Sequence, residues 1–300
     1  MSKKNNVSAA SSSVSSQYQK ENRALAVWNR LKTNKGAVIA LVVLILLILM
    51  MFYSFIFISF DDITKINSKH MFEKPSAAHP FGTDEMGRDL MKRCIYGSRY
   101  SITVGFGSVV MGIIFGTVFG AIAGYYGGWV DNLIARACDV LSSLPGTLLG
   151  MVIMSILGAK LGNLIIAIGI SCIAGFIRMA RASVLTTKGN EYVEAARAIG
   201  MSEMRIIFTQ VLPNSLSPLI VTATTRLSTA VLSASGLSFL GFGIPVPKPE
   251  WGALISGSRN YLQFAPHLCY FPGLFIMLLA LSCSLLGDGL RDALDPKLNK

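Results

Sequence analysis

The sequence predicts an all-α integral membrane protein with six transmembrane helices. Hydrophobic residues make up 52% of the 300 residues, charged residues only 14%, and the mean hydropathy is +0.54. Soluble domains carry about 25% charged residues, so an ordinary soluble protein is excluded. The net charge of +11 falls between long apolar runs rather than along one polar face. This placement is typical of membrane flanks and not of a nucleic-acid-binding surface.

The first two spans are uncharged runs, at residues 36–60 and 101–125. Each is longer than the roughly 20 residues that cross a bilayer as a helix. The second run has a glycine at every fourth position, which places these residues on one helix face. Small residues on one face let two helices approach closely in lipid, so we interpret the stripe as a packing seam. The seam consists of Gly112, Gly116, Gly120 and Gly124.

Four further spans follow along the chain. The third begins near Trp129 and runs through residues 140–157, with Pro145 expected to kink it. The remaining spans are expected at residues 161–177, ending at Arg178 and Arg181, at 214–239 and at 268–286.

An even number of spans places both termini on the same side of the membrane. Lys and Arg residues are more numerous in the segments that share a side with the termini, which favours cytoplasmic termini by the positive-inside rule. Residues 1–21 are Ser-rich and polar, so we expect a disordered cytoplasmic tail there.

Several kinds of site lack a sequence signal. The five cysteines form no C-x-x-C pair, which argues against a disulfide framework or a zinc site. No G-x-x-x-x-G-K-[ST] motif occurs, so any ATPase must be a separate chain. His70, His79 and His267 have no ligand spacing, and no nucleophile motif gathers Ser, His and Asp. We therefore expect no catalytic residue, no metal ligand and no cofactor, and hence no enzyme.

Two polar or amphipathic residues near the spans have alternative interpretations. Asp139 is either a buried proton-relay carboxylate or, as we favour, the structural partner of Arg136 three residues before it. Trp251 either meets a docking protein or anchors the chain at the membrane interface.

The loop at residues 186–213 predicts two short helices joined by a turn. Glu191–Ala198 is rich in helix formers, Gly200 suits the left-handed conformation that ends a helix, and Ser202 is a candidate N-cap. Pro213 marks the entry to the fifth span. Such a pair is too polar to insert into lipid, and its character is typical of docking into a groove on a partner protein.

This loop resembles the EAA loop of permease subunits of ATP-binding-cassette importers, where it contacts the ATPase. The usual apolar residue two positions before the leucine is Gln210 here, which leaves the frame of the motif unchanged. The residues that carry the resemblance, and that it assigns to ATPase coupling, are Glu194, Ala195, Ala196, Gly200, Leu212 and Pro213.

Three more segments resemble the C-type permease of dipeptide, oligopeptide and nickel importers. They are HPFGTDEMGRD at 79–89 with YGSR at 96–99, LSFLGFG at 237–243, and GDGLRDALDP at 287–296. The resemblance implies a type I importer permease fold, with an N-terminal transmembrane segment at 22–75 and a transporter transmembrane domain at 97–295.

The resemblance also implies partners and a function. The expected assembly contains a homologous B-type permease, two cytoplasmic ATP-binding subunits and an extracytoplasmic solute-binding protein, and it imports di- or oligopeptides through the bilayer. A nickel or metal-complex importer and a stand-alone secondary transporter are the alternatives. We expect no nucleic-acid partner.

Arg226 is the one charge near the middle of the fifth span. An arginine near the bilayer centre costs about 2.5 to 3.5 kcal/mol on insertion scales, so its side chain should face the bundle or the pore. It either lines the pathway and attracts a peptide carboxylate, which we favour, or pairs with an acid of the partner permease.

Overall fold

The computed structural model describes residues 23–294, with the side chains of residues 23, 24 and 26 excepted. Within that range the chain is helical and has no strand beyond an isolated bridge between Thr83 and Asp89. The elements are α2 (Arg23–Leu31), α3 (Lys35–Phe57), α4 (Phe60–Thr64), η1 (Ser68–His70), α5 (Leu90–Tyr126), α6 (Gly128–Ser143), α7 (Gly146–Leu157), α8 (Leu161–Thr187), α9 (Glu191–Ala198), α10 (Glu203–Ile206), the π-helical turn η2 (Ile207–Val211), α11 (Leu212–Asn214), α12 (Leu216–Phe239), α13 (Trp251–Ser258), η3 (Arg259–Tyr261) and α14 (His267–Leu294).

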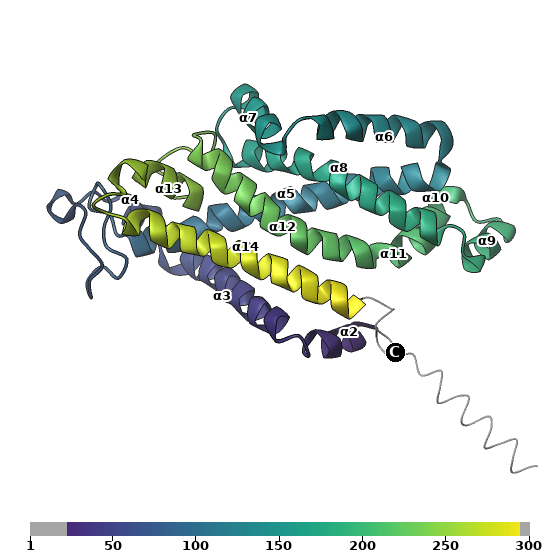
Figure 1. Ribbon diagram of the computed structural model, residues 1–300, viewed down its shortest axis with the longest axis horizontal. Coiled ribbons are helices and arrows are strands. Elements are labelled where there is room, and N and C mark those ends of the chain that lie inside the picture. The colour runs from purple at the N-terminus through teal and green to yellow at the C-terminus, as the bar shows by residue number, and fades with distance from the viewer. Residues whose placement is uncertain (1–22, 295–300) are drawn as a thin grey trace, which may run out of the picture.

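The long helices lie side by side along the length of the molecule, with α9 at one end and α4 and α13 at the other (Figure 1). In the described range, α3, α5, α8 and α14 are each long and apolar enough to cross a membrane. Two bent pairs, α6 with α7 and the segment 203–214 with α12, bring the number of spans to six when each pair is counted as one span. The predicted all-α, six-span fold is therefore confirmed.

Two helices extend far beyond their apolar runs. Helix α5 begins at Leu90, where the Asp89 side chain caps it by accepting a hydrogen bond from the Lys92 backbone N–H. Helix α8 continues to Thr187 instead of ending at residue 177. Arg181 stays inside α8 because its guanidinium donates two hydrogen bonds, of 2.5 and 2.6 Å, to the Asp131 carboxylate. Hydropathy marks the lipid-facing part of a helix and not its ends.

The third span is broken rather than kinked. Helices α6 and α7 meet at 88°, with Leu144 in an extended conformation and Pro145 before the first residue of α7. A proline has no N–H to donate and disfavours helical geometry in the residue before it. The expectation of one bent helix across 140–157 is wrong, because both effects act together here.

Helices α5 and α8 share the most extensive helix–helix contact among the described residues. A Cβ added at Gly116 would lie 2.3 Å from Phe176 Cβ, and one added at Gly120 would lie 2.5 Å from the Ile177 carbonyl oxygen. Only glycine permits this approach, so the stripe lets the two backbones come together over several turns. The four buried residues that face α8 are Gly112, Gly116, Gly120 and Gly124.

Trp251 lies inside the protein, which contradicts both of its predicted roles. The side chain is fully buried at the start of α13, its indole N–H donates to the Cys94 carbonyl at 2.8 Å, and its ring stacks on Phe275. The residue before it, Glu250, is also buried and caps α13 by accepting a hydrogen bond from the Ala253 N–H. Trp251 thus anchors α13 to α5 and α14 and is available neither to a partner nor to lipid.

Candidate coupling site and translocation surface

The loop between α8 and α12 forms a compact unit at one end of the bundle (Figure 1). Helix α9 has the bounds that the sequence predicts, Glu191–Ala198, and Gly200 follows it with φ of +81°. That backbone conformation is unfavourable for residues with a Cβ, so glycine permits the chain to turn back into α10. Ser202 occupies the N-cap position of α10, but its side chain makes no capping hydrogen bond.

Helix α9 has one buried and one exposed face. Val193 and Ala196 are buried in a small apolar cluster that also contains Ala121 and Val184. Glu194 and Ala195 are exposed on the opposite side. Adjacent helical residues point about 100° apart, so Ala196 packs against its own bundle while Ala195 faces outward, and the assignment of both residues to ATPase coupling stays a prediction.

A polar network ties the unit to the end of α5. The Tyr125 hydroxyl donates to the Glu203 carboxylate, and Arg197 donates to the Tyr125 oxygen at 3.1 Å and pairs with Glu203 at 3.3 Å. The hydrogen bond with Tyr125, and then the charge of Glu203, raise the pKa of Arg197. Lys188 adds a hydrogen bond of 2.9 Å to the Gly124 carbonyl. Helix α9 is thus joined to α5 by both apolar and polar contacts.

The second half of the loop leads into the bundle at an angle. Leu212 packs against the same apolar cluster, whereas Pro213 is exposed in the first turn of α11. The segment 203–214 meets α12 at 63°, so the span proper begins at Leu216 and not at Pro213. Ser215 lies at the bend, where its hydroxyl donates to the Val211 carbonyl at 2.9 Å.

Large apolar side chains are exposed around the coupling unit. They belong to α9, to the turn that follows it, to α10 and to η2. The residues are Tyr192, Ile199, Met204 and Phe208, with Ile199 78% exposed. Exposed apolar residues that lie together mark protein or membrane contacts, so these four are candidates for such a contact.

Arg226 lies near the middle of α12 and contributes to the walls of two cavities. One, of about 600 Å³, is also lined by Asp288 and Arg291 of α14. The other, of about 270 Å³, opens toward Ser142 and Gly146 at the break between α6 and α7. Within residues 23–294, Arg226 makes no ion pair.

The guanidinium of Arg226 lies over Gly175 of α8, where an added Cβ would come within 2.6 Å of its Nη2. The glycine makes room for a charged side chain between α8 and α12. The arginine side chain therefore faces the neighbouring helix α8, in agreement with the prediction that it faces the bundle or the pore.

Asp139 does not pair with Arg136. Its carboxylate lies 3.5 Å from Arg178 of α8, and its side chain is 65% exposed. The prediction of an i, i+3 pair is wrong because the neighbouring helix supplies the cation. The second reading, a buried proton relay, is contradicted by the exposure.

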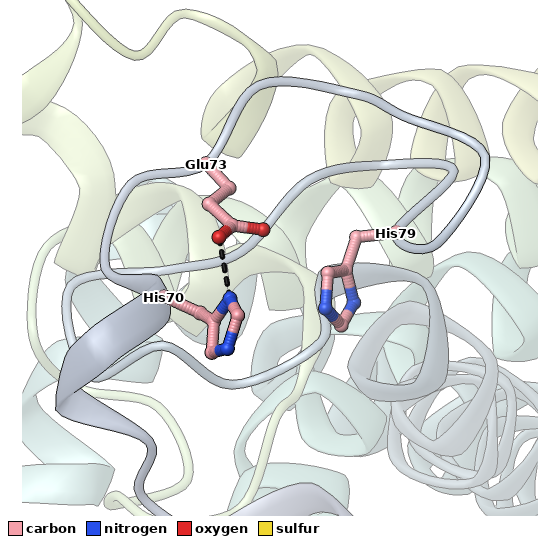
Figure 2. Close-up of side chains that lie close together, drawn as sticks. All are labelled: His70, Glu73 and His79. Carbon is pink, nitrogen blue, oxygen red and sulfur yellow. Dashed lines mark hydrogen bonds and ion pairs between the residues drawn. The ribbon is translucent and has the colours of Figure 1, made fainter.

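At the opposite end of the bundle, residues 66–89 fold into a loop whose internal contacts the sequence did not predict. Its centre is the buried Asp84 carboxylate, which pairs with Arg88 at 2.7 Å and with Arg93 of α5. The loop also brings His70, Glu73 and His79 together (Figure 2). The spacing of these residues in the sequence does not predict the group, because the irregular backbone of the loop determines which side chains lie together.

Comparison with known proteins decides the family. Residues 116–300 match the model of the binding-protein-dependent transport system inner membrane component, and residues 25–75 match the N-terminal TM domain of oligopeptide transport permease C. The chain belongs to the family of binding-protein-dependent transport permeases. The resemblance to C-type permeases is confirmed, and this family is a transport component rather than an enzyme family.

Individual relatives match the permease over most of its length. The dipeptide transport system permease protein DppC of Alkalihalophilus pseudofirmus is 44% identical over 90% of this chain and 89% of its own. The glutathione transport system permease protein GsiD of Pectobacterium atrosepticum is 40% identical over 90% of both chains.

Among solved structures, the inward-facing MetNI methionine ABC transporter resembles the permease with a TM-score of 0.56 at 19% identity. The match covers 69% of this chain and 98% of that one, and it supports the type I importer fold.

Proposed function

We propose that this permease forms, with a homologous B-type permease, the pathway by which an ATP-driven importer moves di- or oligopeptides across the cytoplasmic membrane. Two cytoplasmic ATP-binding subunits would power it, and an extracytoplasmic solute-binding protein would deliver the peptide. The observation that carries the proposal is the match to dipeptide and glutathione permeases over about nine tenths of the chain. Glutathione is itself a short peptide, so both named substrates share an amide backbone and carboxylates.

The coupling helix in this proposal is α9, with its exposed apolar surroundings docked on an ATPase. Glu194 and Ala195 would contact the ATPase, while Ala196, Gly200 and Leu212 hold the helix on its own bundle. Closure of the ATPases would move α9, and the network around Tyr125 would pass the movement to α5. This arrangement requires the loop at 186–213, and with it both termini, to lie in the cytoplasm.

Arg226 has a role in the pathway in this proposal. It lines two cavities and has no acidic partner within the described residues, so it is available to a mobile anion. Every peptide presents a carboxylate at its C-terminus, and an acidic side chain adds a second one, so an acidic peptide gains more from charge-assisted hydrogen bonds to arginine than a neutral one does. The alternative is a structural pair with an acid of the partner permease.

The alternative functions have less support. A stand-alone secondary transporter needs a buried coupling-ion carboxylate, and Asp139, which the sequence offers for this role, is exposed and paired with Arg178. A nickel importer would use the same fold, but both named relatives that cover nine tenths of the chain carry peptide substrates in their names.

The test is uptake by the reconstituted transporter with its ATPases and binding protein. Arg226→Gln should leave assembly intact and slow the uptake of an acidic dipeptide about tenfold more than that of a neutral one, because one charge-assisted bond is worth about 1.5 to 3 kcal/mol and 1.4 kcal/mol is a factor of ten. Arg226→Lys, which keeps the charge, is the matched control. Loss of the B-type subunit from the purified Arg226→Gln complex would instead establish the pairing role.

A further inference from the structure

Three side chains converge in the loop between α4 and α5, at the end of the bundle remote from α9 (Figures 1 and 2). His70 is the last residue of η1, and Glu73 and His79 follow it in the irregular segment before α5. One potential ligand atom from each residue lies within 4.8 Å of the other two. His70 Nδ1 is 2.5 Å from Glu73 Oε1.

The backbone that carries these residues is held by its own hydrogen bonds. The Thr83 hydroxyl donates to the His70 carbonyl and accepts from the Glu73 N–H at 2.9 Å. The Thr83 N–H donates to the Glu73 carbonyl at 3.1 Å, and the Gly82 N–H donates to the His79 carbonyl at 2.8 Å. Thr83 is fully buried. These hydrogen bonds therefore fix the backbone at all three residues.

His79 has the orientation that metal-binding histidines adopt. Its Nδ1 lies 2.8 Å from Oδ2 of Asp89, whose other oxygen caps α5 through the Lys92 N–H at 2.9 Å. A histidine that donates Nδ1–H to a carboxylate presents Nε2 as a free lone pair, and this second carboxylate makes the imidazole a better ligand. Asp89 is in turn rigid because it is the N-cap of a long helix.

We propose that His70, Glu73 and His79 bind one divalent transition-metal ion of the zinc class. Two imidazoles and one carboxylate are a ligand set for Zn²⁺ and its borderline neighbours, whereas Mg²⁺ and Ca²⁺ prefer oxygen ligands alone. Four ligands around Zn²⁺ at about 2.0 to 2.2 Å lie roughly 3.3 to 3.6 Å apart. The ion would therefore replace the direct hydrogen bond between His70 Nδ1 and Glu73 Oε1, now 2.5 Å long, and separate these two atoms by about 1 Å. Ligand atoms that lie farther apart, up to 4.8 Å, would move closer by about the same amount.

The three residues leave the fourth coordination position open to water or to a group from a docked partner. The site is accessible, since the side chains of His70, Glu73 and His79 are 45%, 37% and 27% exposed. The ion would link η1 to the segment at 73–79. The contact between His79 and Asp89 would connect this site to the start of α5. This inference does not depend on the transported substrate.

Titration of the chelator-treated, full-length chain with Zn²⁺ in detergent tests the site, with Co²⁺ absorption as a second readout of tetrahedral nitrogen and oxygen ligation. We expect about one Zn²⁺ per chain, with affinity at least about tenfold weaker in His70→Gln and in Glu73→Gln. Asp89→Asn keeps a capping oxygen but weakens the hydrogen bond to His79, and it should cost about 10- to 100-fold in affinity.

Glu85→Gln is the matched control, since it removes one negative charge from the same loop at a residue paired with Arg88 outside the cluster. It should leave Zn²⁺ affinity unchanged. Equal Zn²⁺ binding by the wild-type chain and by the His70→Gln and Glu73→Gln variants would overturn the proposal, as would no binding to the wild type at 100-fold excess of metal. Should His79→Gln disturb folding, Glu73→Gln still decides, because its exposed carboxylate supports no other described contact than that with His70.

Discussion

Gly116 offers a direct measure of the seam between α5 and α8. In Gly116→Ala the new Cβ would lie 2.3 Å from Phe176 Cβ and 3.0 Å from the Ile173 carbonyl oxygen. Carbon atoms prefer about 3.5 to 4.0 Å, so the helices would have to separate by roughly 1.2 to 1.7 Å or distort locally. Overpacking of this kind costs about 1 to 3 kcal/mol.

A matched control removes the effect of helix propensity, because alanine favours a helix over glycine by about 1 kcal/mol wherever it is placed. Gly273→Ala in α14 has the same chemistry, but its new Cβ would meet Ile255 Cδ1 at 3.9 Å, an ordinary contact. The difference between the two variants therefore isolates the packing cost.

The assay is the free energy of unfolding of the purified chain in mixed micelles, measured by SDS titration with far-ultraviolet circular dichroism. We expect Gly116→Ala to be less stable than Gly273→Ala by about 1 to 3 kcal/mol. A difference under about 0.5 kcal/mol would refute the close approach of α5 and α8, since surface-like substitutions fall in that range.

Three further predictions concern the coupling turn, the topology and the buried tryptophan. Gly200→Val should abolish peptide uptake without reducing membrane insertion, because φ of +81° is strained for a β-branched residue. The control Gly189→Val, in the same loop but without a positive φ, should transport normally. Equal uptake by the two variants would contradict the coupling role. Ser76→Cys should react with a membrane-impermeant thiol reagent in intact cells and Lys32→Cys should not, so labelling at Lys32 would overturn the topology. Trp251→Phe removes the hydrogen bond to the Cys94 carbonyl and should lower the free energy of unfolding by about 1 to 3 kcal/mol. Trp129→Phe, at an exposed residue, should change the free energy of unfolding little. Equal effects of the two substitutions would contradict the anchoring role.

The sequence by itself determined those features that depend on neighbouring residues or on the solvent. Runs of apolar residues located the spans, because a helix that crosses lipid must be apolar regardless of which other helices it contacts. The bounds of α9 and the turn at Gly200 follow from helix propensity and from the conformational freedom of glycine. The spacing of the glycine stripe indicated a packing face, because helical periodicity alone brings every fourth residue to one side.

Only the tertiary structure decided the features that depend on contacts between distant segments. Ala196 is buried and Ala195 exposed because α9 lies on the ends of α5 and α8, and Asp139 pairs with Arg178 because α8 passes beside α6. Trp251 is buried because α5 supplies a carbonyl for its indole N–H.

The cluster of His70, Glu73 and His79 belongs to the second group. Their spacing matches no regular element, and the buried hydroxyl of Thr83 is what joins the two sides of the loop. In an irregular loop, hydrogen bonds between residues distant in the sequence determine which side chains lie close together. Local sequence patterns therefore could not predict this cluster.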